Sequence, residues 1–256
     1  MKYAEMTALE LKNVSREETL VVLPIAAVEQ HGPHMPTATD EIICTAIAEQ
    51  VEQRLKESVL LLPTLWLGAS QHHLRWGATL TSRVENYETL LCEICESLLD
   101  DGFRRVLILN GHGGNIGPMQ ISLRRLQVNY RNCQLMAASY WSIAENEIAS
   151  LMEGKCKTVG HACEAETSLI MHLRPELVRK SKIENFDDYA PDMVDGVYLC
   201  NDMYQRTQNG ATGRPDLASA EKGTQMFSLI VERVAEVVQE LQKFSLPTQE
   251  SGLALG

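Results

Sequence analysis

Three short stretches of the sequence place carboxylate and imidazole side chains where they could bind a metal ion. The first is LPIAAVEQHGPHMPTATD, residues 23–40, in which Glu29, His31 and Asp40 follow an apolar run. We expect a strand to end just before Glu29, so that Glu29 and His31 point to the same face while Gln30 turns away. The prolines and the glycine predict a rigid loop that returns Asp40 to the same neighbourhood as a helix begins. Two carboxylates and an imidazole on rigid backbone suit a divalent ion such as zinc, manganese or iron.

Each of these side chains also has an ordinary structural explanation. Asp40 could be the N-cap of the helix that follows it, Glu29 a surface acid and His31 a loop histidine. Their conjunction within residues 29–40 favours the functional interpretation.

The second stretch is LNGHGGN, residues 109–115, in which a predicted strand runs into a glycine-rich turn. A dinucleotide-binding fingerprint requires a glycine where Ile116 stands, so that interpretation is disfavoured. The glycines around His112 indicate a backbone that bends sharply and approaches a neighbour closely, with the imidazole directed into a cleft. The alternative, that His112 only satisfies its own hydrogen bonds in a turn, stays open.

The third stretch is VGHACEAETS, residues 159–168. His161 comes just before a predicted helix, and Glu164 and Glu166 lie in its first turn, where the helix dipole favours acids. The residues around them are apolar, however, and a carboxylate on a buried face needs a compensating partner. These two acids are therefore further candidates for the site.

The elements that must position these residues alternate between strand and helix. We expect strands at residues 19–27, 59–67, 105–110 and 133–140, and helices at residues 40–57, 85–101, 116–130, 162–173 and 219–244. This order predicts an α/β fold with a mostly parallel sheet, helices on both faces and ligands bound beyond the carboxyl ends of the strands. Residues 68–83 should be a loop, and residues 181–216 should pack over the site as loops and short strands. No linker divides the chain, which predicts a single domain, residues 1–256.

Composition excludes several other functions. The 256 residues are 45% hydrophobic with a formal net charge of -11, which argues against a nucleic-acid or anionic membrane partner. We see neither a secretory signal nor an apolar run long enough to span a bilayer. The seven cysteines lie mostly in apolar segments and include a C-x-x-C in a predicted helix, as expected of reduced core thiols in a cytoplasmic protein.

Four segments resemble the signature segments of the creatininase family of metal-dependent amidohydrolases. They are EQHGPHMPTATD, NGHGGN, GHACEAETS and GATGRPDLASAEKG, and they occur in the family's order between residues 23 and 223. The resemblance implies a three-layer α/β/α sandwich, usually assembled as a homohexamer. It also implies two adjacent divalent ions per chain, bridged by an aspartate and by a water or hydroxide.

The resemblance assigns roles to individual residues. Asp40 matches the bridging aspartate, and Glu29 and His112 match the other protein ligands of one ion. His31 matches a ligand of the second ion. His161 matches a histidine that transfers protons beside the substrate.

One metal ligand of the creatinine-hydrolysing members has no counterpart at the same position in this chain. Creatinine-hydrolysing members have a glutamate where this chain has Gly114, so we expect Glu164 to complete the second metal site. Glu166 would serve catalysis by holding a ligand or His161 through hydrogen bonds.

These expectations define a reaction: metal-activated water hydrolyses a C–N amide bond, cyclic or linear, of a small molecule, and His161 acts as general acid. Creatinine-hydrolysing members have a tryptophan and an aspartate where Lys157 and Thr158 stand here, which argues against creatinine as the substrate. The alternative is a metal-binding member of the same fold without turnover, a sensor or scaffold. A nucleophilic Cys163 is a minor further option.

Overall fold

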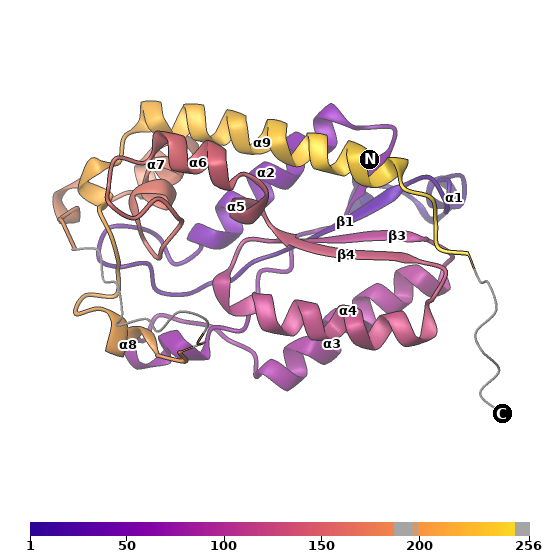
Figure 1. Cartoon of the computed structure of the whole chain (residues 1–256), viewed down its shortest axis with the longest axis horizontal. Helices are drawn as coiled ribbons and strands as arrows, with labels where there is room; N and C mark the ends of the chain where they lie inside the picture. The colour runs from indigo at the N-terminus through magenta and orange to yellow at the C-terminus, as the bar shows by residue number, and fades with distance from the viewer. Residues whose placement is uncertain (187–196, 198, 249–256) are drawn as a thin grey trace.

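The centre of the molecule is a parallel β-sheet with helices on both faces (Figure 1). The structure, a computed structural model, describes residues 1–186, 197 and 199–248. Within these residues the strands are β1 (Leu20–Ile25), β2 (Val59–Leu61), β3 (Arg105–Asn110) and β4 (Gln134–Ser139), in the order β2-β1-β3-β4. The predicted α/β class and layered, mostly parallel architecture are therefore confirmed.

The helices connect and cover these strands. They are α1 (Ala8–Lys12), α2 (Thr39–Arg54), α3 (Val84–Asp100), α4 (Ile116–Asn129), α5 (Tyr140–Ile143), α6 (Glu145–Leu151), α7 (Glu164–Leu173), α8 (Met203–Arg206) and α9 (Ala220–Lys243). Short 3-10 turns lie at η1 (Tyr3–Glu5), η2 (Gln71–Trp76), η3 (Gly113–Asn115), η4 (Pro175–Leu177), η5 (Lys180–Lys182) and η6 (Pro215–Leu217).

The sheet separates two hydrophobic cores. Leu20 and Val22 of β1 pack with residues of α2, α7 and α9, whereas Val21 and Leu23 pack with residues of α3 and α4. Successive side chains of a strand point to opposite faces, so a strand covered on both sides must be apolar throughout. This is why β1 reads as an unbroken apolar run.

The strand register brings the first two chemical stretches together. Ile25 at the end of β1 pairs with Asn110 at the end of β3, and Asn110 pairs with Ser139 at the end of β4. The segments that carry Glu29 and His112 therefore leave the sheet side by side, at its carboxyl edge, as predicted for a parallel sheet.

Some predicted elements differ from the structure. The second strand is short because Pro63 follows it, and beyond Leu61 only a single bridge joins Leu65 to Ile25. Residues 68–83, predicted to be a loop, contain η2, and the sequence analysis missed α5 and α6. Helices of one or two turns are too short to show a helical period in the sequence.

The segment at residues 181–216 also differs from the prediction. Where it is described, it contains η5, α8 and η6 rather than short strands, while residues 187–196 and 198 lie outside the described residues.

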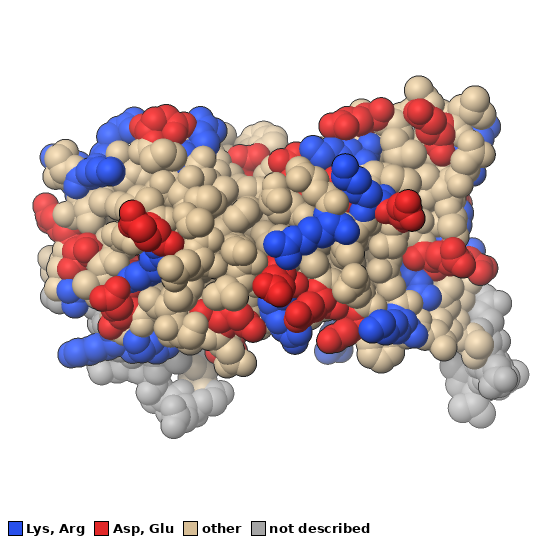
Figure 2. Space-filling view, turned by 90° about the horizontal axis from the view of Figure 1, so that it is seen from above, with Lys and Arg blue, Asp and Glu red and all other residues tan. Residues whose placement is uncertain are grey.

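The surface over α9 carries basic and acidic side chains interspersed, without a large field of either sign (Figure 2). In the described part of the chain, no helix has the length and apolar character needed to cross a membrane.

Candidate metal centre

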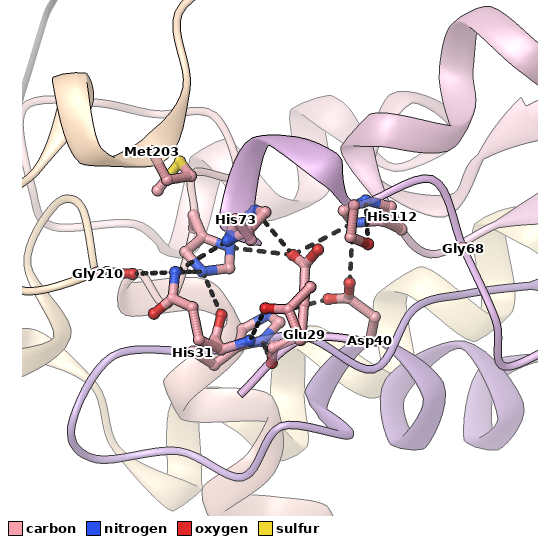
Figure 3. A network of polar contacts seen from close by, with 12 residues as sticks. Glu29, His31, Asp40, Gly68, His73, His112, Met203 and Gly210 are labelled. Carbon is pink, nitrogen blue, oxygen red and sulfur yellow. Dashed lines mark hydrogen bonds and ion pairs between the residues drawn. The ribbon is translucent and has the colours of Figure 1, made fainter. Parts of the chain in front are cut away.

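Asp40 belongs to a buried cluster of acids and histidines (Figure 3). Its Oδ1 is 3.0 Å from His31 Nε2, and its Oδ2 is 3.0 Å from His112 Nδ1. It sits in the first turn of α2 rather than at the N-cap, which is Ala38. One carboxylate therefore faces two imidazoles that come from different loops.

Glu29 forms the second part of the cluster. Its Oε1 lies 3.1 Å from His73 Nε2, 3.4 Å from His112 Nδ1 and 3.6 Å from His161 Nδ1. The side chain is 1% exposed. A carboxylate buried to this degree needs positively charged or metal partners.

Glu166 reaches the same cluster from the first turn of α7. Its Oε1 is 3.9 Å from His31 Nε2, while its Oε2 accepts a hydrogen bond from the backbone N–H of Cys163 at 3.3 Å. His31 is oriented from its other side, where Nδ1–H donates to the carbonyl oxygen of Glu29 at 3.1 Å.

Glu29 Oε2 is buried and has no hydrogen-bond partner, while the buried atoms His31 Nε2 and Asp40 Oδ2 have only the ion-pair contacts given above. Such atoms are rare in folded proteins unless something else satisfies them. Among the described residues, three sets of potential ligand atoms converge here: Glu29, His72 and His112; His31, Asp40 and Glu166; and Glu29, His31 and His161. Oxygen and imidazole ligands of this kind fit divalent cations.

Burial and neighbouring charges change the pKa values of the cluster. Burial raises the pKa of Glu29 to about 7, and the charge of Asp40 adds to this effect. Burial also acts to raise the pKa of Asp40, but His31 and His112 outweigh it and hold that pKa well below its usual range. Burial and the nearby histidines keep the pKa of His161 well below its ordinary value, so its imidazole is neutral.

The turn after β3 fixes His112. Asn110 accepts a hydrogen bond from the His112 N–H at 3.0 Å and donates to its carbonyl oxygen at 2.8 Å. A Cβ at Gly114 would lie 2.1 Å from the carbonyl oxygen of Ala69 and 2.5 Å from His112 Nε2. The turn therefore has no room for a side chain at this position, and a ligand must come from another element.

Glu164, predicted to be that ligand, does not join the cluster. Its carboxylate accepts hydrogen bonds from the backbone N–H groups of Glu153 and Gly154, both at 2.9 Å, and forms an ion pair with Lys222. The structure brings Glu166 to His31 instead. The physical reason is the helical geometry, because residues two apart point in different directions around a helix.

Gln30 also differs from the prediction, since its side chain turns toward the site. Its Nε2 lies 2.9 Å from His73 Nδ1, 3.1 Å from His161 Nε2 and 2.9 Å from the carbonyl oxygen of Gly210. The prediction assumed an extended strand here, but β1 ends at Ile25.

The Gln30 contacts select the tautomers of two histidines. His161 Nε2 lies 2.8 Å from the backbone carbonyl oxygen of Gln30, which can only accept a hydrogen bond. This nitrogen therefore carries the proton, and Nδ1 carries none. The Gln30 amide then donates to His73 Nδ1, which leaves His73 Nε2–H to donate to Glu29.

We expect Gln30→Ala to lower kcat by about 10- to 100-fold with little change in KM or metal content, because it removes the side-chain amide that holds His73 without removing a ligand. Nitrogen-15 NMR of the histidine rings should show an altered tautomer population for His73 and an unchanged one for His161, whose partner is the Gln30 backbone carbonyl oxygen. Gln50→Ala, on the surface of α2, is the matched control. Unchanged ring spectra in Gln30→Ala would contradict the assignment.

A pocket of about 400 Å³ opens onto the cluster. Its lining includes three residues that the sequence analysis did not single out, Trp141, Met203 and Arg206, together with Thr212 of the segment GATGRPDLASAEKG. No motif marked Trp141, Met203 or Arg206, because they come from segments without regular spacing. His72 and His73 line the pocket, whereas His34 instead lies 2.9 Å from the hydroxyl of Thr167.

Cys163 lacks the features of a nucleophile. Its Sγ accepts a hydrogen bond from the Gly160 N–H at 3.3 Å, and burial raises its pKa to about 12.

A family model described as creatinine amidohydrolase matches residues 4–238. The mycofactocin precursor peptide peptidase of Mycobacterium tuberculosis is 29% identical over 223 residues, which cover 83% of this chain and 81% of the relative. The creatinine amidohydrolase of Pseudomonas putida is 26% identical over 248 residues, covering 89% of this chain and 91% of the relative.

Solved structures agree with these matches. A creatinine amidohydrolase (creatininase) superposes with a TM-score of 0.80 at 25% identity, covering 95% of this chain and 98% of that one. A mutant creatininase of Zn-Zn type has the same TM-score, identity and coverage. A manganese form gives 0.79 at 25% identity, covering 95% and 99%.

Proposed function

Because the chain belongs to the creatininase family, we propose that it is a metal-dependent amidohydrolase that cleaves a C–N amide bond other than a peptide bond. The observation that carries this proposal is the position of Asp40, whose two carboxylate oxygens each lie 3.0 Å from a different histidine. A carboxylate that faces two ligand groups in this way can bridge two cations.

The residues present suit a two-metal centre. Glu29, Asp40 and His112 would hold one cation, and His31, Asp40 and Glu166 would hold the other. Zinc, manganese and iron are the candidate metals. When bound, two such cations would lower the pKa of a water to about 7 and would polarise the amide carbonyl.

His161 would move the proton in this reaction. Its imidazole is neutral, and its bare Nδ1 faces Glu29 at 3.6 Å. It can accept a proton from the attacking water at Nδ1 and deliver it to the departing nitrogen. The hydrogen bond from Nε2–H to the Gln30 carbonyl holds the ring in the orientation that this transfer needs.

The substrate is an amide, cyclic or linear, small enough for the pocket, and creatinine is disfavoured. Lys157 donates to the carbonyl oxygen of Met152 at 2.5 Å, and neither Lys157 nor Thr158 lines the pocket. At these two positions the chain therefore lacks the tryptophan and the aspartate of the creatinine-hydrolysing members. We also propose a cytoplasmic protein that assembles as a homohexamer, by resemblance to the family.

The experiment combines metal analysis with a substrate panel. Protein loaded with zinc, manganese or iron should contain two ions per chain and should hydrolyse at least one lactam, formamide or acyl amide, which is measured as the appearance of a free amino group. Two ions without turnover of any amide would favour the non-catalytic sensor or scaffold. One ion or none would contradict the two-metal centre.

A further inference from the structure

The pocket contains a guanidinium group that no carboxylate of the described residues neutralises. Arg206 lines the pocket together with His72 and Met203. Among the described residues, its contact is with Met203 Sδ at 3.9 Å, and no acid lies within ion-pair distance of it. Arginine remains charged at any physiological pH, so this group is a fixed positive charge in the pocket.

The short helix α8 holds Arg206 in place. Asp202 caps this helix by accepting a hydrogen bond from the Gln205 N–H at 2.9 Å. Arg75 of η2 pairs with Asp202 at 3.3 Å and stacks over Tyr204 at 4.2 Å from the ring centroid. The helix is therefore fixed to η2, whose His72 and His73 belong to the pocket wall.

The acids of the pocket are not available to Arg206. Glu29, Asp40 and Glu166 face the histidines of the cluster and are the proposed metal ligands. Within the described part of the chain Arg206 therefore has no acidic partner, and an anionic group of the substrate would supply one.

We propose that Arg206 binds an oxyanionic group of the substrate, so that the substrate class is an amide that carries a carboxylate or a phosphate. This inference rests on the proposed function and specifies its substrate. The planar guanidinium offers two parallel N–H donors, which match either oxyanion. Trp141, Val159 and Ile116 supply apolar wall for the part of the molecule that joins the oxyanion to the amide.

Three matched compounds test this proposal: N-acetylglycine, its phosphonate analogue and the neutral N-acetylglycinamide. Calorimetry of metal-loaded and of metal-free protein should show the anionic compounds binding about 10- to 100-fold more tightly than the neutral one, as expected for a charged hydrogen-bonded pair. A preference for one of the two anions identifies the group that the pocket takes.

Arg206→Gln should abolish this preference and Arg206→Lys should retain part of it. The control is Arg125→Gln, because Arg125 pairs with Glu88 on the surface of α3 and α4. Equal binding of anionic and neutral compounds to the wild type, or an unchanged preference in Arg206→Gln, would overturn the inference. If the preference depends on Arg206 but no amide is hydrolysed, the oxyanion site stands and the hydrolase function fails.

Discussion

Asp40→Asn should remove both metal and activity from the protein. Asp40 contacts His31 through one oxygen and His112 through the other, so it belongs to both halves of the proposed centre. Loss of a residue that only supports a ligand costs about 10- to 100-fold in affinity or activity, and loss of a shared ligand should cost more. We expect metal content to fall below one ion per chain and kcat/KM to fall by more than about 100-fold.

The comparison variant is His161→Gln, which should lose turnover and keep both ions, because His161 is assigned to proton transfer. Asp101→Asn is the matched acid control, since Asp101 pairs with Arg16 away from the site. Plasma mass spectrometry gives the metal content, and amine release gives the turnover. Two ions and undiminished turnover in Asp40→Asn would remove the bridging assignment.

The sequence predicts the two central strands, β1 and β3, well because they are buried on both faces. The predicted bounds of the strand at residues 105–110 are those observed for β3. The run RVLILN is short, apolar and rich in branched side chains, which is typical of a strand buried on both faces. The parallel order also predicts that Glu29 and His112 lie at the same edge of the sheet. A single domain over residues 1–256 stays a prediction.

The rest of the site depends on contacts between distant segments, which local patterns do not encode. Gln30 belongs to the site because Gly210, far along the chain, accepts its hydrogen bond at 2.9 Å. Arg206 lines the pocket because the ion pair between Arg75 of η2 and Asp202, the N-cap of α8, holds α8 beside η2. Neither partnership leaves a motif or a period in the sequence.

The choice between Glu164 and Glu166 shows the same limit, because both lie in the first turn of α7 and both are buried. The sequence cannot say which way each points, since this depends on where the helix begins. In the structure the helix begins at Glu164, which directs this residue to Lys222 and leaves Glu166 facing His31.

Glu166→Gln should therefore lose one of the two ions, while Glu164→Gln should keep both. Glutamine preserves the shape of each side chain but removes the charge that a divalent cation or an ammonium group requires. For Glu164→Gln we expect a decrease of about 1–3 kcal/mol in the free energy of unfolding, because the Lys222 ammonium loses a buried charged partner. For Glu166→Gln we expect one ion per chain and a lower kcat.

Metal analysis and urea unfolding of the metal-free proteins separate the two effects, because the first reports ligation and the second reports folding. Each variant serves as the control for the other, since they differ only in which acid of one helical turn is neutralised. If Glu164→Gln lost an ion and Glu166→Gln kept two, the second metal site would have to include Glu164. The loop at Glu153 and Gly154 would then have to release that carboxylate when metal binds.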